Sequence, residues 1–233
     1  MSVKRLLYID DNKIDSQIEN LRKKLKRSGI ELVETFLNLG DDKFKIRNSD
    51  NGRIVLNIPI IKDYITLNLF DESFDIVASD YDYSDDSLDG YSLLKWIMNV
   101  SRSQRLRIRR AKFCLYSAQQ DKLVERLDSP AKIKELVKLK IDDFINRDNL
   151  SEDLTSILTK QKENYVFPEH IIKYLEKFPE QKFRNTFPKF KEKTLSEIAH
   201  EIDKDLPNGV EFQKYIVELT VAHLIELNNF PKE

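Results

Sequence analysis

Short apolar runs alternate with segments of helical pattern along the first two thirds of this 233-residue chain. The apolar runs, each of strand length, cover residues 4–10, 31–37, 74–80, 111–117 and 141–146. The helical segments cover residues 14–25, 59–70, 91–100, 121–138 and 150–158. Strands that alternate with helices form parallel sheets with helices on both faces. The pattern therefore predicts an α/β fold with a doubly wound, five-stranded parallel sheet.

One segment interrupts this alternation between the second strand and the second helix. Residues 44–47 and 53–57 flank the turn-forming sequence Asn-Ser-Asp-Asn-Gly. Two short runs on either side of such a turn are typical of a β-hairpin. The sequence thus predicts a hairpin inserted into the α/β fold.

The composition changes after about residue 165, where five of the seven prolines lie. No strand-like run follows, while residues 195–206 and 212–227 have helical periodicity. We expect three parts: an α/β domain over 1–150, a linker helix over 151–164, and a small all-α output or interaction domain over 165–233.

Composition limits the kinds of protein this chain can be. The 39 Lys and Arg residues balance 40 Asp and Glu residues, which argues against a surface built wholly for nucleic acid. The single cysteine, Cys114, cannot form an internal disulfide. There is no apolar run of the roughly 20 residues that span a bilayer, and no signal-peptide pattern. We expect a cytoplasmic protein that does not enter a membrane.

Polar residues follow the predicted strands at the point where each strand ends. Asp10 and Asp11 close the first strand, Asp80 closes the third, and Ser117 closes the fourth. In the strand order 2-1-3-4-5, the first and third strands are neighbours at the switch point where ligands bind. Three carboxylates would meet there and disfavour one another's ionisation. A bound Mg²⁺, which prefers oxygen ligands and commonly bridges carboxylates to phosphate, would relieve that repulsion.

This arrangement resembles the receiver domain of two-component response regulators. The matching pieces, in the family's order, are LLYIDDN at 6–12, DIVASD at 75–80, LDGYSLLKWI at 88–97, LYSA at 115–118 and IDDFINR at 141–147. The resemblance implies a flavodoxin-like fold over the first domain. It also implies a phosphoprotein of a phosphorelay rather than an enzyme, with a histidine kinase or phosphotransfer protein as its partner.

The resemblance assigns a role to each residue that matches the family's motifs. Asp11 would bind Mg²⁺ directly, and Asp10 would act mostly through water. Asp80 would be both a metal ligand and the phosphorylated nucleophile. The backbone carbonyl of Asp82 would complete the protein's share of the coordination. Ser117 would donate a hydrogen bond to a phosphoryl oxygen.

Two further positions concern the phosphoryl site and the switch. Phe144 lies where the family has an aromatic residue that turns inward after phosphorylation. Arg147 stands where the family has a lysine, and its forked guanidinium is not the compact charge of an ammonium group. Phosphorylation could therefore be slow, or the switch altered. The case for the metal site would collapse if Asp10, Asp11 and Asp80 lay far apart, or if an arginine filled the space between them.

The chain departs from the family's spacing at two places. The loop from Asp80 to Gly90 is about two residues longer than usual, so Asp82 is an alternative acceptor, although the strand pattern favours Asp80. The stretch between the first and third strands is some two dozen residues too long, and the predicted hairpin accounts for that length.

The leading hypothesis is a signalling switch in which phosphorylation of Asp80 changes the C-terminal helices, which bind a protein partner. One alternative is a degenerate receiver that binds a partner without phosphate. Another is a phosphatase of the haloacid-dehalogenase type, because residues 80–84 resemble its DxDx(T/S) motif. A homodimer is possible. Residues 194–202 could begin a helix-turn-helix, but the acidic, proline-containing stretch that follows argues against DNA binding.

Overall fold

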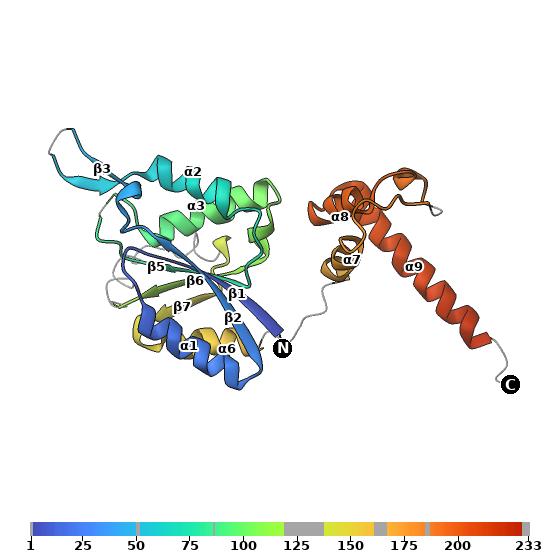
Figure 1. Cartoon of the computed structure of the whole chain (residues 1–233), viewed down its shortest axis with the longest axis horizontal. Helices are drawn as coiled ribbons and strands as arrows, with labels where there is room; N and C mark the ends of the chain where they lie inside the picture. Colours follow the sequence, from blue (N-terminus) through green and yellow to red (C-terminus); the bar gives the residue numbers. More distant parts are fainter. Residues whose placement is uncertain are drawn as a thin grey trace. The chain divides into compact units, whose positions relative to one another are not determined.

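The computed structural model describes residues 2–49, 52–85, 87–118, 138–160, 167–184 and 187–229. The chain divides into two compact units, Met1–Lys162 and Glu163–Glu233. Each unit has its own hydrophobic core and is described by itself. Figure 1 shows the strands of the large sheet in the first unit and helices alone labelled in the second.

Five parallel strands form the sheet of the first unit, in the order β2-β1-β5-β6-β7. They are β1 (Ser2–Asp10), β2 (Ile30–Asn38), β5 (Ile76–Asp80), β6 (Lys112–Ser117) and β7 (Asp143–Asn146). Counted along the chain without the hairpin, this order is 2-1-3-4-5. The predicted sheet is confirmed.

Helices cover both faces of this sheet, as Figure 1 shows. One face packs against α1 (Asp15–Arg27) and α6 (Leu150–Lys160), and the other against α2 (Ile58–Asn68) and α3 (Gly90–Ser103). Neighbouring strand residues point to opposite faces, so Leu6 belongs to one core and Leu7 to the other. Both faces are therefore apolar, which explains why the strands are continuous hydrophobic runs.

The structure differs in what it describes of two predicted helical segments, 121–138 and 151–164. The predicted helix over 121–138 lies almost wholly outside the described residues. Helix α6 covers most of the segment 151–164 that the sequence assigns to a linker. In the structure α6 belongs to the first unit, since Leu154 and Leu158 share a core cluster with Leu21 of α1.

The predicted hairpin is present in the first unit. Strands β3 (Lys45–Arg47) and β4 (Ile54–Leu56) pair antiparallel and form a separate two-stranded sheet. The hairpin is attached to the loop that follows β5, because the Leu56 backbone N–H donates to Asp85 Oδ2 at 2.5 Å.

The second unit consists of helices around an aromatic core. They are α7 (Phe167–Leu175), α8 (Leu195–Asp203) and α9 (Pro207–Asn229). Phe187, Phe190 and Phe212 are buried with their ring centroids 5.0 to 5.3 Å apart. Thr194 and Glu197 form a capping box that fixes the start of α8. Among the described residues of this unit, Lys182 and Thr194 form one isolated antiparallel β-bridge.

Short 3-10 turns complete the described structure: Asp42–Phe44, Arg107–Arg110, Arg147–Asn149 and Pro188–Phe190. Among the described residues, no helix combines the length and the apolar character that crossing a membrane requires.

Cys114 is fully buried in β6, and this burial, with the nearby Asp142, raises the pKa of its thiol to about 12.

Candidate phosphoryl-acceptor site

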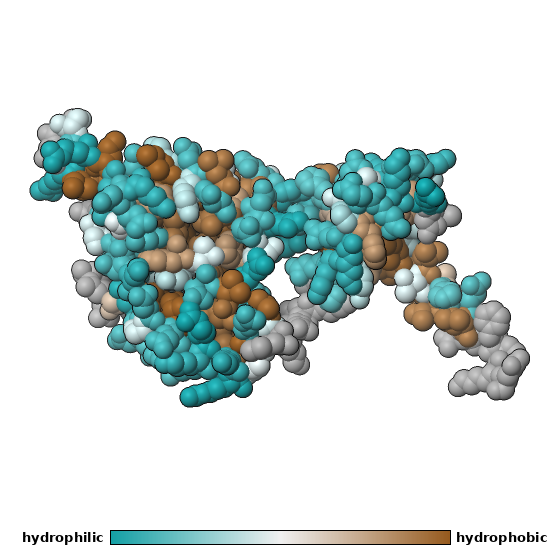
Figure 2. All heavy atoms as spheres, in the orientation of Figure 1, coloured by the Kyte–Doolittle hydropathy of each residue, from teal (hydrophilic) through white to brown (hydrophobic). Residues whose placement is uncertain are grey.

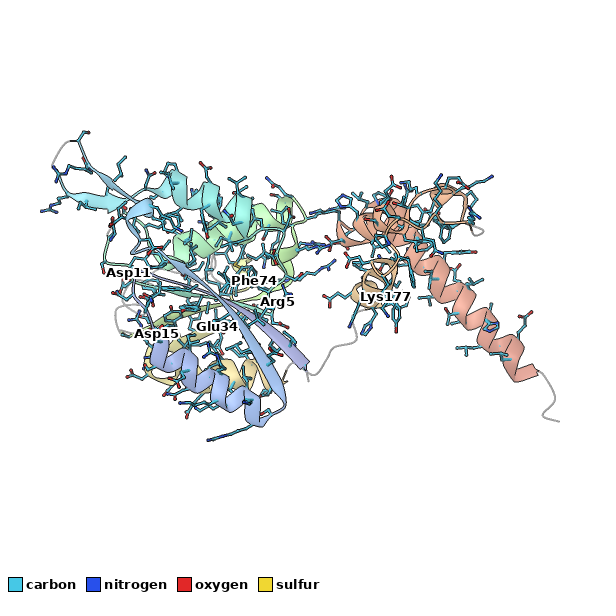
Figure 3. The ribbon with its side chains drawn as sticks, in the orientation of Figure 1. Arg5, Asp11, Asp15, Glu34, Phe74 and Lys177 are labelled. Carbon is cyan, nitrogen blue, oxygen red and sulfur yellow. The ribbon has the colours of Figure 1, made fainter. Side chains whose placement is uncertain are left out.

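The carboxyl ends of the central strands bring the predicted polar residues to one edge of the sheet. Strand β1 ends at Asp10, β5 at Asp80 and β6 at Ser117, and all three side chains are buried. Figure 3 shows Asp11 at this edge, with Arg5 and Phe74 toward the opposite one. The register explains the arrangement, because β1 and β5 pair in parallel and end together.

Three carboxylates meet at this edge. One oxygen from each of Asp10, Asp11 and Asp80 lies within 4.8 Å of the others, close enough to share a cation. This group contains Asp80 and not Asp82, which lies half-buried in the following loop. Asp80, the acceptor predicted from the strand pattern, therefore lies beside Asp10 and Asp11.

Burial and mutual repulsion dominate the electrostatics of this group. Desolvation, followed by the charge of Asp10, raises the pKa of Asp80 to about 7 against the opposing effect of Arg147. Burial also raises the pKa of Asp10, despite hydrogen bonds from Asn12 and Tyr116. Asp11 differs from both: burial acts to raise its pKa, but hydrogen bonds from Ser84, together with those involving Asp10 and its own backbone, lower the pKa overall.

Arg147 lies against two of the three carboxylates. Its Nη2 donates to Asp10 Oδ2 at 3.1 Å and forms a short hydrogen bond to Asp80 Oδ2. Its buried Nε has no hydrogen-bond partner within the described residues. Arg147 thus lies between Asp10 and Asp80 and neutralises part of the acidic group, which counts against the metal site. Its buried Nε–H is still available as a donor.

Tyr116 is a member of the site that the sequence did not indicate. Its hydroxyl donates to Asp10 Oδ2 at 2.8 Å, and the guanidinium carbon of Arg147 lies 5.6 Å from its ring centroid. The ring therefore supports the arginine while the hydroxyl holds Asp10. In an apolar run, a tyrosine before Ser117 looks like an ordinary core residue. The sequence pattern therefore does not indicate that its hydroxyl reaches Asp10.

The loop after β5 is held against the site at its middle and at its C-terminal end. The Ser84 backbone N–H donates to Asp11 Oδ2 at 2.8 Å. Asp89 caps α3 by accepting from the Ser92 N–H. Gly90 packs against the backbone of Asp80, and a Cβ at this position would lie 1.7 Å from the Asp80 carbonyl oxygen. Only glycine fits there, which fixes the approach of α3 to the acceptor strand.

Phe144, the predicted switch residue, lies in β7 with 36% of its surface exposed. Its neighbour Ile145 points into the core instead. The aromatic side chain is therefore outside the core formed by α1, α6 and the sheet.

The order β2-β1-β5-β6-β7 is the flavodoxin-like order, and the acidic group lies beside its β1/β5 switch point. The first unit therefore has a flavodoxin-like fold. The chain matches no protein-family profile and no curated protein.

Similar solved structures include several response regulators. RcsB from Salmonella enterica serovar Typhimurium, bound to the rprA promoter in the presence of a phosphomimetic, is 15% identical, with 91% of this chain and 99% of that chain covered and a TM-score of 0.38. FixJ from B. japonicum is 16% identical over 76% and 68% of the two chains, with a TM-score of 0.36. A LuxR-family regulator from Staphylococcus aureus is 14% identical over 67% and 97%, with a TM-score of 0.34. The assignment of the flavodoxin-like fold rests on the strand order rather than on these superpositions.

Proposed function

We propose that the first unit accepts a phosphoryl group on Asp80 from a histidine kinase or phosphotransfer protein, that this reaction requires Mg²⁺, and that the helical unit responds to it. One observation carries the proposal: Asp10 and Asp11 at the end of β1 and Asp80 at the end of β5 each place one oxygen within 4.8 Å of the others. The chain then serves as a phosphoryl acceptor and does not turn over a substrate.

The residues present suit a magnesium ion. All three side chains offer carboxylate oxygens, the ligands that Mg²⁺ prefers. When the three are ionised, Arg147 offsets one negative charge and leaves two, which a divalent cation neutralises. Asp10, Asp11 and Asp80 would hold the ion, with the carbonyl of Asp82 as the fourth protein ligand that the receiver resemblance implies. The ion supplies charge neutralisation for the phosphoryl group during transfer.

The protein's own groups account for the rest of the proposed transfer. An ionised Asp80 oxygen forms the new bond to phosphorus as the bond from phosphorus to the donor's histidine nitrogen breaks, and the imidazole keeps the electron pair. Arg147 Nε, buried and without a partner in the described residues, can donate to a phosphoryl oxygen. Ser117, buried at the end of β6, is the second proposed donor.

The proposed response starts from the charge that phosphorylation adds beside Arg147. An acyl phosphate on Asp80 would compete with Asp10 for the guanidinium group and release the present contact. Phe144, partly exposed on β7 three residues before Arg147, is then free to move toward the core. We propose that a protein partner of the C-terminal helices detects this change.

A second function is favoured by the same arginine. Because Arg147 already pairs with Asp10 and Asp80, the acidic group is partly neutralised without a metal. A receiver that is stable in this state could bind its partner without phosphate. This degenerate receiver differs from the switch in one respect: neither Mg²⁺ nor a phosphoryl donor would change it.

The deciding experiment is phosphorylation with acetyl phosphate, with and without Mg²⁺, followed by intact mass spectrometry. Wild type and Asp82→Asn are expected to gain one phosphoryl group only with Mg²⁺, and Asp80→Asn to gain none. Asp82→Asn is the matched control, since it removes an acid of the same loop that lies outside the carboxylate group. Failure of the wild type to gain mass, together with no thermal shift from Mg²⁺ and beryllofluoride, would establish the degenerate receiver.

The phosphatase alternative has its own assay. Turnover of a chromogenic phosphate ester that is lost in Asp82→Asn would identify Asp82 as an acid–base group. Stable phosphorylation of Asp80 without turnover of the ester supports the acceptor instead.

A further inference from the structure

The second half of α9 extends beyond the core of its own unit. Phe212 is buried among the aromatic rings, whereas every residue from 217 to 227 is exposed. At 1.5 Å per residue, these eleven residues extend the helix by roughly 16 Å. Figure 1 shows this part of α9 projecting away from α7 and α8.

The exposed half of α9 is mostly apolar. Val217, Leu219, Val221, Leu224, Ile225 and Leu227 are 46% to 57% exposed. Figure 2 shows hydrophobic side chains on the same part of the helix. A helix that is apolar on most sides is normally buried, and an apolar surface of this kind marks an interaction site.

One stripe of this surface faces away from the unit's own core. At 3.6 residues per turn, Val210, Val217, Val221 and Leu224 lie within about 60° of one another around the helix axis, roughly opposite to Phe212. We call these four residues the α9 stripe. The core that covers Phe212 lies on the other side of the helix and leaves the stripe open.

Charge excludes two kinds of ligand for the stripe. Residues 217–227 contain Glu218 and Glu226 and no Lys or Arg. Binding to anionic lipid or to nucleic acid depends on cationic side chains, and these are missing here. The stripe therefore suits a protein surface.

The spacing of the stripe identifies a second helix of the same kind as its counterpart. Val210, Val217 and Leu224 recur every seven residues, and Val221 lies between the last two, which is the spacing at which two helices pack together. The four residues of the stripe carry no charge. Lys214, seven residues before Val221, is exposed on the same face of the helix, so we infer that the two helices run antiparallel, which keeps each Lys214 away from the Lys214 of the other copy. A two-fold pair of this type covers the same residues on both copies.

The unit also offers a cavity next to the protruding half of α9. A cavity of about 440 Å³ is lined by Ile171, Tyr174 and Leu175 of α7, by Ile216 of α9 and by His170. Each copy thus presents an apolar helix end and, beside its base, an apolar cavity. Ile216 lies roughly 110° around the helix axis from the stripe, so this cavity is outside the proposed contact.

We propose that the chain forms a homodimer through the α9 stripe, with the stripe of one copy packed against the stripe of the other. The proposal is independent of phosphorylation, because every residue it uses belongs to the second unit. The dimer should therefore persist in Asp80→Asn, which distinguishes its failure from failure of the proposed phosphoryl transfer.

Sedimentation velocity of the full chain over a wide range of concentration tests this dimer. Wild type and Asp80→Asn are expected to have the mass of two chains. Val221→Glu puts a charge in the stripe and should weaken the dissociation constant at least about tenfold. Ala222→Glu is the matched control, since it adds the same charge one residue later, to the side of the stripe, and should leave the dimer intact. Tyr174→Ser changes the cavity instead of the stripe and should leave the dimer intact.

Several outcomes would overturn the proposal. One is a wild-type monomer at every concentration, including a monomer in which hydrogen exchange shows slow amides over 217–227, because the chain would then cover its own stripe. Another is a dimer that Val221→Glu leaves unchanged. Far-ultraviolet circular dichroism of each variant establishes that the helices remain folded; the stripe is exposed in the single chain, so folding should not depend on Val221.

Discussion

Arg147 forms a hydrogen-bonded ion pair with Asp80, whose carboxylate is almost completely buried at the carboxyl edge of the sheet. The pair explains how an acid can be held in the interior beside Asp10. Removing the guanidinium group of Arg147 would leave Asp10 and Asp80 buried next to each other without a positive charge to pair with. The consequences for stability can be measured directly.

Arg147→Ala should lower the free energy of unfolding of the first unit by about 1.5–3 kcal/mol when divalent ions are absent, because charged hydrogen bonds are lost. Urea denaturation in a chelator, followed by the fluorescence of the single tryptophan, Trp96, measures this unit. Arg147→Lys keeps the positive charge, so its free energy of unfolding should fall by less. Equal stability of wild type and Arg147→Ala would mean that the ion pair contributes nothing.

The pH dependence of stability follows from the raised pKa of Asp80. In the unfolded chain an aspartate loses its proton near pH 3.9, but in the folded chain Asp80 keeps it to about pH 7. Between these values folding takes up a proton, so the contribution of Asp80 to stability falls as pH rises and is constant above about pH 7. Asp80→Asn should lose this part of the slope in urea midpoints measured from pH 4 to pH 8.

Stabilisation by Mg²⁺ should have the opposite dependence on pH. The metal binds ionised carboxylates, so its binding must displace the proton from Asp80. The thermal shift produced by a fixed concentration of Mg²⁺ should therefore increase from pH 5.5 to pH 8 in wild type and be much smaller in Asp80→Asn. A shift of the same size at both pH values would contradict a site that includes Asp80.

Tyr116→Phe tests the hydroxyl that holds Asp10. Loss of one hydrogen bond to a buried acid should reduce stability by about 1–2 kcal/mol. The loss should be larger at pH 8 than at pH 5, because the hydroxyl favours the ionised form of Asp10. Tyr83→Phe is the control: its hydroxyl lies 2.5 Å from the Ser79 hydroxyl, and its loss should be similar at both pH values. If Tyr116→Phe lost the same stability at pH 5 and pH 8, Tyr116 would not act on the ionisation of Asp10.

Gly90→Ala tests the contact between α3 and the acceptor strand. The new Cβ would meet the Asp80 carbonyl oxygen, and backbone atoms on both sides cannot move easily, so we expect a loss of about 3 kcal/mol or more. Gly29→Ala is the comparison, because Gly29 has a φ of 74° but no atom near the added Cβ. It should cost only the strain of that backbone conformation, about 1 kcal/mol. Similar losses in both variants would contradict the close contact.

The strand positions, the hairpin and the meeting of Asp10, Asp11 and Asp80 were all predictable from the sequence. Each depends on a local pattern: an apolar run, a turn sequence, or an acid directly after a strand. In a parallel sheet, strand ends meet at one edge whatever the details of packing, so local patterns were sufficient to place these acids.

The features that the sequence left open depend on which side chains meet after folding. The Tyr116 hydroxyl reaches Asp10 only because β6 and β1 lie on either side of β5. The contact of Arg147 with both Asp10 and Asp80 depends likewise on the path of the chain after β7. Helix α9 begins five residues before the predicted start at 212, because Pro207 is acceptable in the first turn of a helix.

The burial of Cys114 has a practical consequence for spectroscopy. Thiol reagents attack the thiolate, and a fully covered side chain with a pKa of about 12 presents almost none at neutral pH. The natural chain should therefore remain unlabelled by maleimide under native conditions. A cysteine introduced at an exposed position of α9 would then carry a spin label or fluorophore alone, without first replacing the native thiol.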